Sequence, residues 1–440
     1  MRAFGFAIKW NGYQVLLTGI DPEGGSCKPF KIMKTKIIFA SALLLFAFAC
    51  DDGDNVIPEK TSLLKLTVDA SWAGLGADNW IIVHGEDGSL LASESFAADQ
   101  ELEIVTDKPA PGKITVTHLR HIISNGNKHY VATSYLNIEK GKHMILKVAD
   151  GTPSQLTGEL NVSVTDVGYR DHHSVSSRVG SAGSASWSSG DYILHLRSST
   201  FAGVSKHIVT VSDGYSLKHK VLNNVQPNDS YSFSLNDMDL FDKTVDFTFP
   251  QSNQVTLYVQ GSEPDATLIP NRYTLTSHFN SDPHTTIKAG YLNSLTNYNT
   301  YLYIVYPEYQ YEYENLAAIP DGNIAWPQKS DFNISEKSFT NFSATTSKSY
   351  VWRKSRWGYS DVASKTVVTW DVLSSSGNQS ILELPSEITS VHPILSLNNI
   401  KHASTTFYTQ SPAFESIVNA DFENGPEPNG LRLGIRIITN

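Results

Sequence analysis

The chain has 440 residues, a formal net charge of −10 at neutral pH and only two cysteines. The acidic balance argues against nucleic-acid binding, which rests on Lys and Arg neutralising phosphates. Two cysteines are too few for a disulfide framework or a cysteine-based metal site. The length suits two or three domains held together by core packing.

The most informative stretch is MKTKIIFASALLLFAFACDDGD, at 33–54. Two lysines precede an apolar run over 37–48, and Ala49, Cys50 and three aspartates follow. The run is shorter than the ~20 residues that a membrane-spanning helix needs. It fits the hydrophobic region of a signal peptide, which is about 7–15 residues long. A core helix would carry a polar stripe, which this run lacks. The stretch therefore predicts export.

Residues 47–50 resemble the lipobox of bacterial lipoproteins, in which the thiol becomes the first mature residue and carries acyl chains. Ala49 and Cys50 match, whereas Ala47 stands where Leu is usual and Phe48 where a smaller residue is usual. With the aspartates that follow, the pattern is similar to surface-exported lipoproteins of the Bacteroidota. The resemblance implies an outer-membrane protein, lipid-anchored through Cys50 and facing the cell exterior. Each buried methylene contributes about 0.8 kcal/mol, so two or three acyl chains would hold it stably.

The place of the signal also bears on where the protein begins. Because a signal peptide starts a chain, we expect translation to begin at Met33, with a cytosolic extension over 1–32 as the alternative. Residues 1–49 carry six Lys or Arg and two Asp or Glu, so their removal changes the net charge from −10 to −14. A surface this acidic argues against electrostatic adhesion to anionic lipid. The lipid anchor is then the predicted membrane contact.

The mature chain is predicted to be all-β, with two or three immunoglobulin-like or transthyretin-like sandwich domains in tandem. An acidic linker over 50–61 comes first. The first domain, over 62–150, shows the alternation of half-buried strands, and Asn125-Gly126 is its strongest hairpin signal. Seven short strands in about ninety residues are typical of a sandwich.

The second domain is predicted over 151–264, with further strands of the same kind. Within it, 170–190 is poor in large apolar residues and rich in Ser and Gly, which predicts a long surface loop. A third β-rich region over 265–440 is the predicted binding module. It includes an irregular segment over 309–350 and short helices near 313–319 and 413–418.

A tyrosine run over 298–313 is the most unusual local feature. On an extended strand, period two places Tyr309, Tyr311 and Tyr313 on one face. One hypothesis is an aromatic platform that stacks on sugar rings beside carboxylates. The alternative is a strand whose tyrosines pack in the core, and Pro307 interrupts the continuous platform.

A dense basic cluster occurs in the segment YVWRKSRWGYSD at 350–361. Trp352, Arg353, Arg356 and Trp357 are candidate ligand-binding residues for an acidic sugar or a partner protein, since Arg and Trp are typical of binding hot spots. The alternative is a hairpin whose cations pair with carboxylates nearby.

Metal binding has one weak candidate, the segment SLNDMDLFD with Asp237, Asp239 and Asp242. Its oxygen ligands suit calcium. The segment lacks the Gly and final Glu of the calcium-binding helix-loop-helix signature, and a capped turn is the alternative. The histidines are not expected to assemble a site, and no cofactor is predicted.

The leading hypothesis is a non-catalytic binding or adhesion protein of the cell surface that captures a glycan or a protein partner. One alternative is a structural or assembly subunit, pilus-like or of a matrix, that pairs by strand addition. A second is a surface glycan hydrolase whose carboxylate pair is set by the fold and is invisible in the sequence.

Overall fold

The structure is a computed structural model. It describes residues 60–440, apart from gaps at 71, 73–75, 148–154, 170–171, 181–184, 215, 265–271, 281, 376–381, 383 and 440. The predicted signal, Cys50 and all but the end of the predicted linker lie outside the described residues. Residues Ile57–Asn440 form one compact unit. Among the described residues, no helix combines the length and apolarity needed to cross a membrane.

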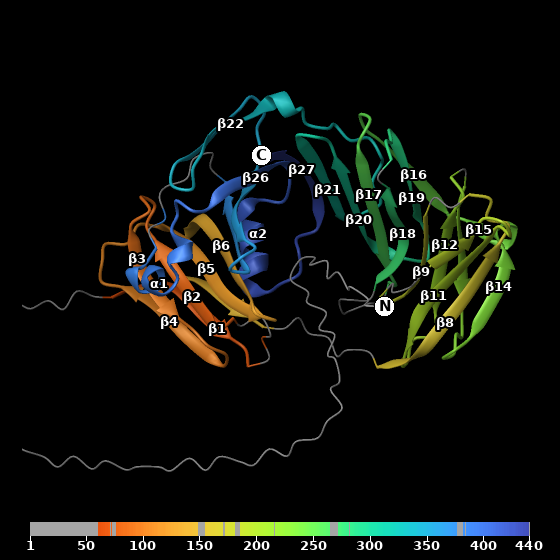
Figure 1. Ribbon diagram of the computed structural model, residues 1–440, viewed down its shortest axis with the longest axis horizontal. Helices are drawn as coiled ribbons and strands as arrows, with labels where there is room; N and C mark the ends of the chain where they lie inside the picture. Colours follow the sequence, from red (N-terminus) through yellow and green to blue (C-terminus); the bar gives the residue numbers. More distant parts are fainter. Residues whose placement is uncertain are drawn as a thin grey trace, which may run out of the picture. The chain divides into compact units, whose positions relative to one another are not determined.

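The predicted all-β class is confirmed, with 59% of the described residues in strands and 7% in helices. One sheet dominates, and its order is β18-β17-β20-β21-β27-β26-β24-β25-β6-β5-β2-β3. Figure 1 shows its strands coming from widely separated parts of the sequence. Neighbours in this long sheet are antiparallel except β25 and β6, which run parallel.

The first part of the chain forms a sandwich. Its strands are β1 (Thr61–Val68), β2 (Asp78–His84), β3 (Leu90–Ser95), β4 (Gln100–Thr106), β5 (Lys113–Ser124), β6 (Asn127–Glu139) and β7 (Lys142–Leu146). The sheet β4-β1-β7 packs on the long sheet through a core that includes Leu64, Ile81 and Ile104. The predicted hairpin is present, since Asn125 (φ 51°) and Gly126 (φ 76°) join β5 to β6.

The middle part forms a second sandwich of two four-stranded sheets, β10-β11-β8-β14 and β15-β13-β12-β9. Its elements are β8 (Leu156–Thr165), β9 (His172–Ser177), β10 (Ala185–Ser188), β11 (Ile193–Phe201), β12 (His207–Ser212), β13 (Leu217–Leu222), β14 (Ser230–Ser234), η1 (Leu235–Asp237) and β15 (Asp239–Leu240). Leu160, Leu194 and Val209 lie in the core between these sheets.

The remaining elements extend the long sheet and cover it. They are β16 (Lys243–Thr248), β17 (Gln254–Ser262), β18 (Arg272–Asn280), β19 (Thr286–Tyr291), β20 (Thr296–Val305), β21 (Tyr309–Ala317), η2 (Lys329–Asp331), β22 (Phe332–Lys337), β23 (Phe342–Thr346), β24 (Trp352–Asp361), β25 (Thr366–Ser374), α1 (Ser386–Val391), η3 (Pro393–Leu395), β26 (Lys401–Gln410), α2 (Phe414–Glu423) and β27 (Gly430–Ile438). The pairs β16–β19 and β22–β23 form two small sheets.

The chain is organised differently from the predicted tandem domains. Strands of the predicted 62–150 domain and of the 265–440 region share one sheet through the β6–β25 pairing. The predicted boundary at 264 separates β17 from β18, which pair along their length. The third region is therefore continuous with the first rather than a separate sheet.

The prediction of a long loop over 170–190 is wrong, because β9 and β10 form there. The serines of β9 are buried through hydroxyl contacts rather than apolar bulk. Ser174 Oγ lies 2.7 Å from Thr210 Oγ1, and Ser176 Oγ donates to the Thr274 carbonyl at 2.9 Å. A hydrophobicity pattern cannot detect a strand of this kind. The helix predicted near 313–319 is also wrong, since β21 runs there, whereas α2 confirms the helix near 413–418.

The β6–β25 junction generates a stability prediction. Trp370 of β25 is fully buried, and its Nε1 donates to Ser134 Oγ of β6 at 2.9 Å. We expect Trp370→Ala to lower the free energy of unfolding by about 3–5 kcal/mol through cavity formation. Urea denaturation of residues 57–440 measures this. The control Val362→Ala, at a side chain 90% exposed, should stay within about 0.5 kcal/mol. Similar losses in the two variants would contradict the role of the junction.

Candidate ligand-binding face of the long sheet

The tyrosines of β21 share one face, as the period predicts, but that face is the core. Tyr311 and Tyr313 are 2% and 3% exposed. The ring of Tyr311 stacks on Trp326 at 4.9 Å, and its hydroxyl donates to the Pro327 carbonyl at 2.6 Å. Burial raises the pKa of both phenols. Tyr309 is half-buried and stacks on Tyr306. The platform hypothesis is therefore wrong, and the core alternative holds.

Strand β24 divides the predicted basic cluster between two faces. Trp352 is 4% exposed, and Arg353 and Trp357 are fully buried. The Arg353 guanidinium lies 4.3 Å from the Phe342 ring centroid, and burial lowers its pKa to about 10. These three side chains cannot contact a ligand from solvent, so their prediction as binding residues is wrong. Arg356, by contrast, is only half-buried.

Of the three aspartates proposed for calcium, Asp237 belongs to a capped turn, whereas Asp239 and Asp242 follow that turn. The Asp237 carboxylate and Ser234 form a capping box on η1, and Asp242 Oδ2 accepts from the Asn293 amide at 2.6 Å. Asp239 lies on β15. None of them belongs to a potential metal-binding group among the described residues.

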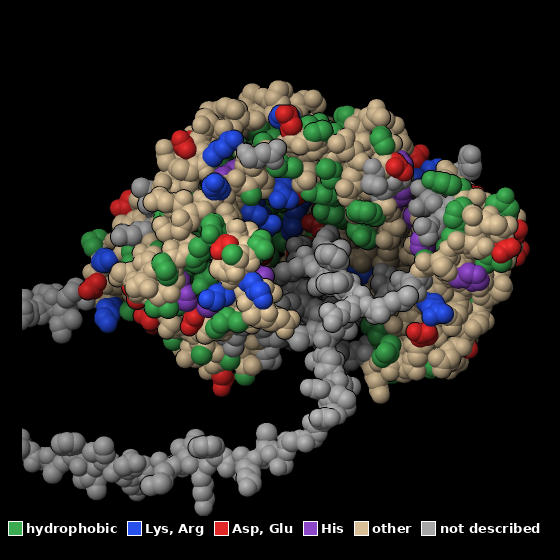
Figure 2. Space-filling view, viewed as in Figure 1, with side chains coloured by type: hydrophobic (Ala, Val, Ile, Leu, Met, Phe, Trp, Pro, Cys, Tyr) green, Lys and Arg blue, Asp and Glu red, His purple; other side chains and the backbone are tan. Residues whose placement is uncertain are grey.

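Strand register places a different set of polar and aromatic residues on the other face of the long sheet, opposite Tyr311 and Tyr313 of β21. Tyr258 pairs with Tyr301, Tyr301 with Glu314, and Glu314 with Arg432. Continuing across β27, β26, β24 and β25, the same face carries Arg436, Tyr408, Lys354, Arg356 and Asp371. We call this set the polar face: Tyr258, Tyr301, Tyr303, Glu312, Glu314, Lys354, Arg356, Asp371, Tyr408, Arg432 and Arg436. Figure 2 shows Lys and Arg side chains gathered in a hollow beside β26 and β27.

The cations of β24 are fixed by one carboxylate. Arg356 donates to Asp371 through Nε at 2.6 Å and Nη2 at 2.8 Å, and Lys354 Nζ lies 3.1 Å from Asp371 Oδ2. Burial alone would raise the pKa of Asp371, but the hydrogen bonds and charges of Arg356 and Lys354 outweigh it and hold that pKa below its usual range. The two-pronged geometry orients the guanidinium rigidly.

The carboxylates of β21 also have partners. Tyr408 Oη donates to Glu312 Oε2 at 3.0 Å, and Arg432 Nη1 donates to Glu314 Oε2 at 3.2 Å. Arg432 also lies 3.6 Å from Glu427. Burial, followed by the charge of Glu427, raises the pKa of Glu314 to about 7 despite Arg432. Glu314 is therefore partly protonated at neutral pH.

Aromatic surface lies beside these ions. The rings of Tyr301 and Tyr303 are near-parallel, with centroids 6.4 Å apart and an interplanar angle of 8°. Tyr258 is 36% exposed on the neighbouring strand β17. Tyrosines of this kind present an apolar ring face and a polar end, which suits contact with a ligand that has both.

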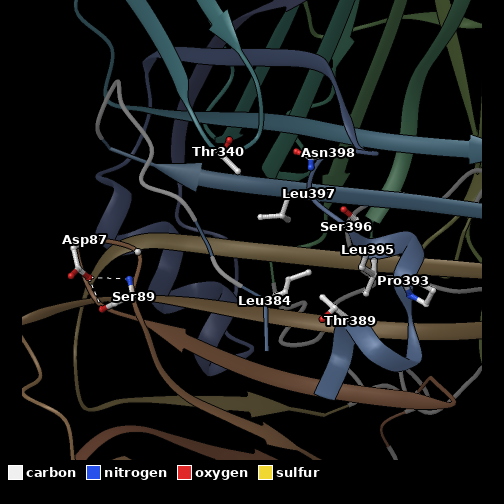
Figure 3. Close-up of a pocket in the computed structure, with 11 residues that line it drawn as sticks. Asp87, Ser89, Thr340, Leu384, Thr389, Pro393, Leu395, Ser396, Leu397 and Asn398 are labelled. Atoms are coloured by element: carbon white, nitrogen blue, oxygen red, sulfur yellow. Dashed lines mark hydrogen bonds between the residues drawn. The ribbon is translucent and has the colours of Figure 1, made fainter. Parts of the chain in front are cut away.

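A separate cavity of about 730 Å³ lies between the β2–β3 turn and the α1–η3 segment. Figure 3 shows Asp87 and Ser89 on one side and Thr389, Pro393 and Leu395 on the other. The Asp87 carboxylate accepts from Ser89 N at 3.0 Å and from Ser89 Oγ at 2.6 Å, and these bonds lower its pKa. Asp87 thus stabilises its own turn.

Two histidines that were not expected to assemble a site lie together in the fold. His121 and His392 share a carboxylate, Asp78, in a group of three potential metal ligands. His121 lies on β5 and His392 follows α1, so only the fold brings them together. Strand pairing accounts for two of the three residues, since Asp78 and His121 lie opposite one another on neighbouring strands.

No protein-family model matches the chain, and none of the curated proteins compared with it is similar to it. What the polar face can bind follows from its residues. It offers four cations, three carboxylates and a row of tyrosines, held in place by the contacts described above.

The raised pKa of Glu314 predicts a pH dependence of stability. A carboxyl whose pKa rises from 4.5 to about 7 on folding favours the folded state while protonated, and this contribution is lost as pH rises through about 7. We expect Glu314→Gln to be more stable than the parent at pH 8, with the difference shrinking toward pH 4.5. Denaturation midpoints of both proteins across this range measure the effect. A constant difference would contradict the raised pKa.

Proposed function

We propose that the protein is a cell-surface lipoprotein, anchored through Cys50, that binds an acidic glycan without catalysis through the polar face. The observation that carries this proposal is the side-by-side arrangement of near-parallel tyrosine rings and fixed ion pairs on that face. Sugar rings present C–H faces that pack on aromatic rings, and their hydroxyls bond to the carboxylates and guanidinium groups beside them.

The charge of the polar face favours an acidic glycan over a neutral one. Its four cations exceed its three carboxylates, and Glu314 is partly protonated at neutral pH. The chain as a whole carries a net charge of −10, so this face differs in sign from the average of the chain. Arg binds planar carboxylate and sulfate groups through paired N–H donors. Uronic acid or sulfated sugar residues are therefore the proposed ligand class.

A glycan hydrolase is the second candidate, and one observation favours it. Glu314 has a pKa of about 7, which is the range that a general acid requires. Against this, the three carboxylates of the polar face each accept a hydrogen bond from a neighbouring side chain. Paired carboxylates orient a ligand, whereas a nucleophile or base must be available to it. Shortening of the bound glycan would identify a hydrolase.

Strand addition finds less support, because both terminal strands of the long sheet are occupied by side chains. On β18, the Thr274 carbonyl accepts from Ser174 and Ser176 of β9. On β3, the Leu90 and Leu91 carbonyls accept from Lys108 and Thr106. Such contacts block an incoming strand. An assembly subunit would form concentration-dependent multimers in sedimentation experiments.

Glycan binding is tested by calorimetry on residues 57–440, with a panel of neutral, uronate-containing and sulfated polysaccharides. We expect an acidic member to bind, and we expect Tyr258→Ala to weaken binding about three- to tenfold through lost stacking. Arg436→Ala should weaken binding and reduce its salt dependence. Tyr169→Ala, at another exposed tyrosine (55%), is the matched control and should bind as the parent does. Binding to no polysaccharide, or equal loss in the control, would contradict the proposal.

Anchoring is tested separately in cells. We expect the full chain to incorporate a labelled fatty acid and to sediment with membranes, and we expect Cys50→Ala to abolish both because no acyl chain can attach. Asn55→Ala, five residues after Cys50, is the control and should change neither. Surface exposure is checked by protease treatment of intact cells. Membrane association that survives Cys50→Ala would rule out the anchor.

A further inference from the structure

We propose that Asp78, His121 and His392 form a binding site for a divalent transition metal, with Zn²⁺ the ion whose preferred ligands match best. Two imidazoles and one carboxylate are a ligand set that zinc takes in proteins. This inference is independent of glycan binding, because the three residues lie outside the polar face.

Three segments bring the ligands together. Asp78 is the first residue of β2 and pairs in register with His121 of β5, so their side chains lie side by side at the end of the sheet. His392 joins α1 to η3 and reaches this point from far along the chain. Tyr130 of β6 pairs with His121 and lies beside both histidines.

The distances fit a site that closes around an ion. His121 Nδ1 lies 3.0 Å from Asp78 Oδ2, and His392 Nε2 lies 3.6 Å from the same oxygen. One ligand atom from each residue lies within 4.8 Å of the other two. Tetrahedral zinc with bonds of about 2.0–2.1 Å places its ligand atoms roughly 3.3 Å apart. Small rotations of the side chains bring all three into range.

Burial leaves imidazole nitrogens in need of a partner. His121 and His392 are 6% and 5% exposed, and Nε2 of each is buried without a hydrogen bond. Buried polar atoms in folded proteins are almost always satisfied, so exceptions require an explanation. An ion bound at His392 Nε2 supplies the missing partner there.

The surroundings hold the rings in a ligating orientation. Tyr130 Oη lies 3.2 Å from His392 Nδ1, which turns Nε2 toward Asp78. The His121 ring stacks on Tyr130 at 4.5 Å, and Trp80 meets His392 edge-on at 5.3 Å. Metal-binding histidines are usually oriented by a hydrogen bond that the N–H of the second ring nitrogen donates. Tyr130 Oη is placed to accept that bond from His392 Nδ1.

A simple Asp–His ion pair does not account for the whole arrangement. It explains the contact of His121 Nδ1 with Asp78, but it leaves His392 Nε2 beyond hydrogen-bond distance of the carboxylate. The Asp78 side chain is 44% exposed, so water has access to a fourth coordination position. The ion would tie the α1–η3 segment to the β2–β5 end of the sheet. Helix α1 itself has no side-chain cap at its start.

The test uses tag-free residues 57–440 stripped of metal by a chelator. We expect calorimetry to detect one Zn²⁺ per chain, and we expect Co²⁺ to give the visible absorption bands of a four-coordinate site that Zn²⁺ then removes. His392→Ala should weaken binding more than about 100-fold, since even the loss of an orienting partner costs 10–100-fold. Tyr130→Phe tests that orienting role, and its loss of Zn²⁺ affinity should fall within this 10–100-fold range.

His143→Ala is the matched control, because His143 is an exposed histidine on β7 outside the group. It should bind Zn²⁺ as the parent does. Circular dichroism of each variant checks that it is folded, and Asp78→Asn replaces His392→Ala if the latter is not. Absence of stoichiometric Zn²⁺ binding by the parent would overturn the proposal, as would equal affinity in the parent and a folded ligand variant.

Discussion

The parallel pairing of β25 with β6 is the interaction on which the rest of the structure depends. It joins the β6-β5-β2-β3 strands to strands that follow much later in the chain, and so makes one sheet out of two. Trp370 lies on this seam, packs against Phe339 at 4.7 Å and donates to Ser134. A parallel pair needs a long connection between its strands, and here the whole middle sandwich lies within that connection.

Alternation along the strands then decides what each residue can do. On β24, Arg353 and Trp357 point into the core, whereas Lys354 and Arg356 point to the polar face. Arg353 and Arg356, which are three residues apart, therefore lie on opposite faces of the sheet. Arg353 is desolvated against Phe342, and Arg356 is held by a buried carboxylate. One basic segment thus contributes a core contact and a surface contact.

The sequence was sufficient for local features and insufficient for those that arise from distant pairing. The Asn125-Gly126 turn and the common face of Tyr309, Tyr311 and Tyr313 were predictable, because turn chemistry and period two are local. Which face of β21 is buried depends on β16 and β19, which pack there, and no local pattern contains that information. The same holds for the polar face, whose members come from seven strands brought together by register.

His392 shows most clearly what the sequence could not predict, because its partner Tyr130 lies 262 residues away in the chain. Spacing rules find metal ligands only when the chain supplies them close together or on adjacent strands. Asp78 and His121 meet the second condition, but a pair alone does not specify a metal site. His392, the third proposed ligand, lies beside them because the β6–β25 pairing determines where the segment after β25 can pack. The long sheet therefore determines the positions of Asp78, His121 and His392 as well as those of the polar-face residues.

The charge distribution is consistent with the proposed selection of an acidic ligand by an acidic protein. Electrostatic interactions between exposed charges fade beyond a Debye length of about 8 Å at physiological salt. The overall negative charge therefore weakly repels any anion at a distance, while the cations of the polar face act only at contact. A free small anion gains one or two such contacts, whereas a glycan chain gains several at once while its rings lie on the tyrosines. Selection then favours a polymer over its isolated charged units.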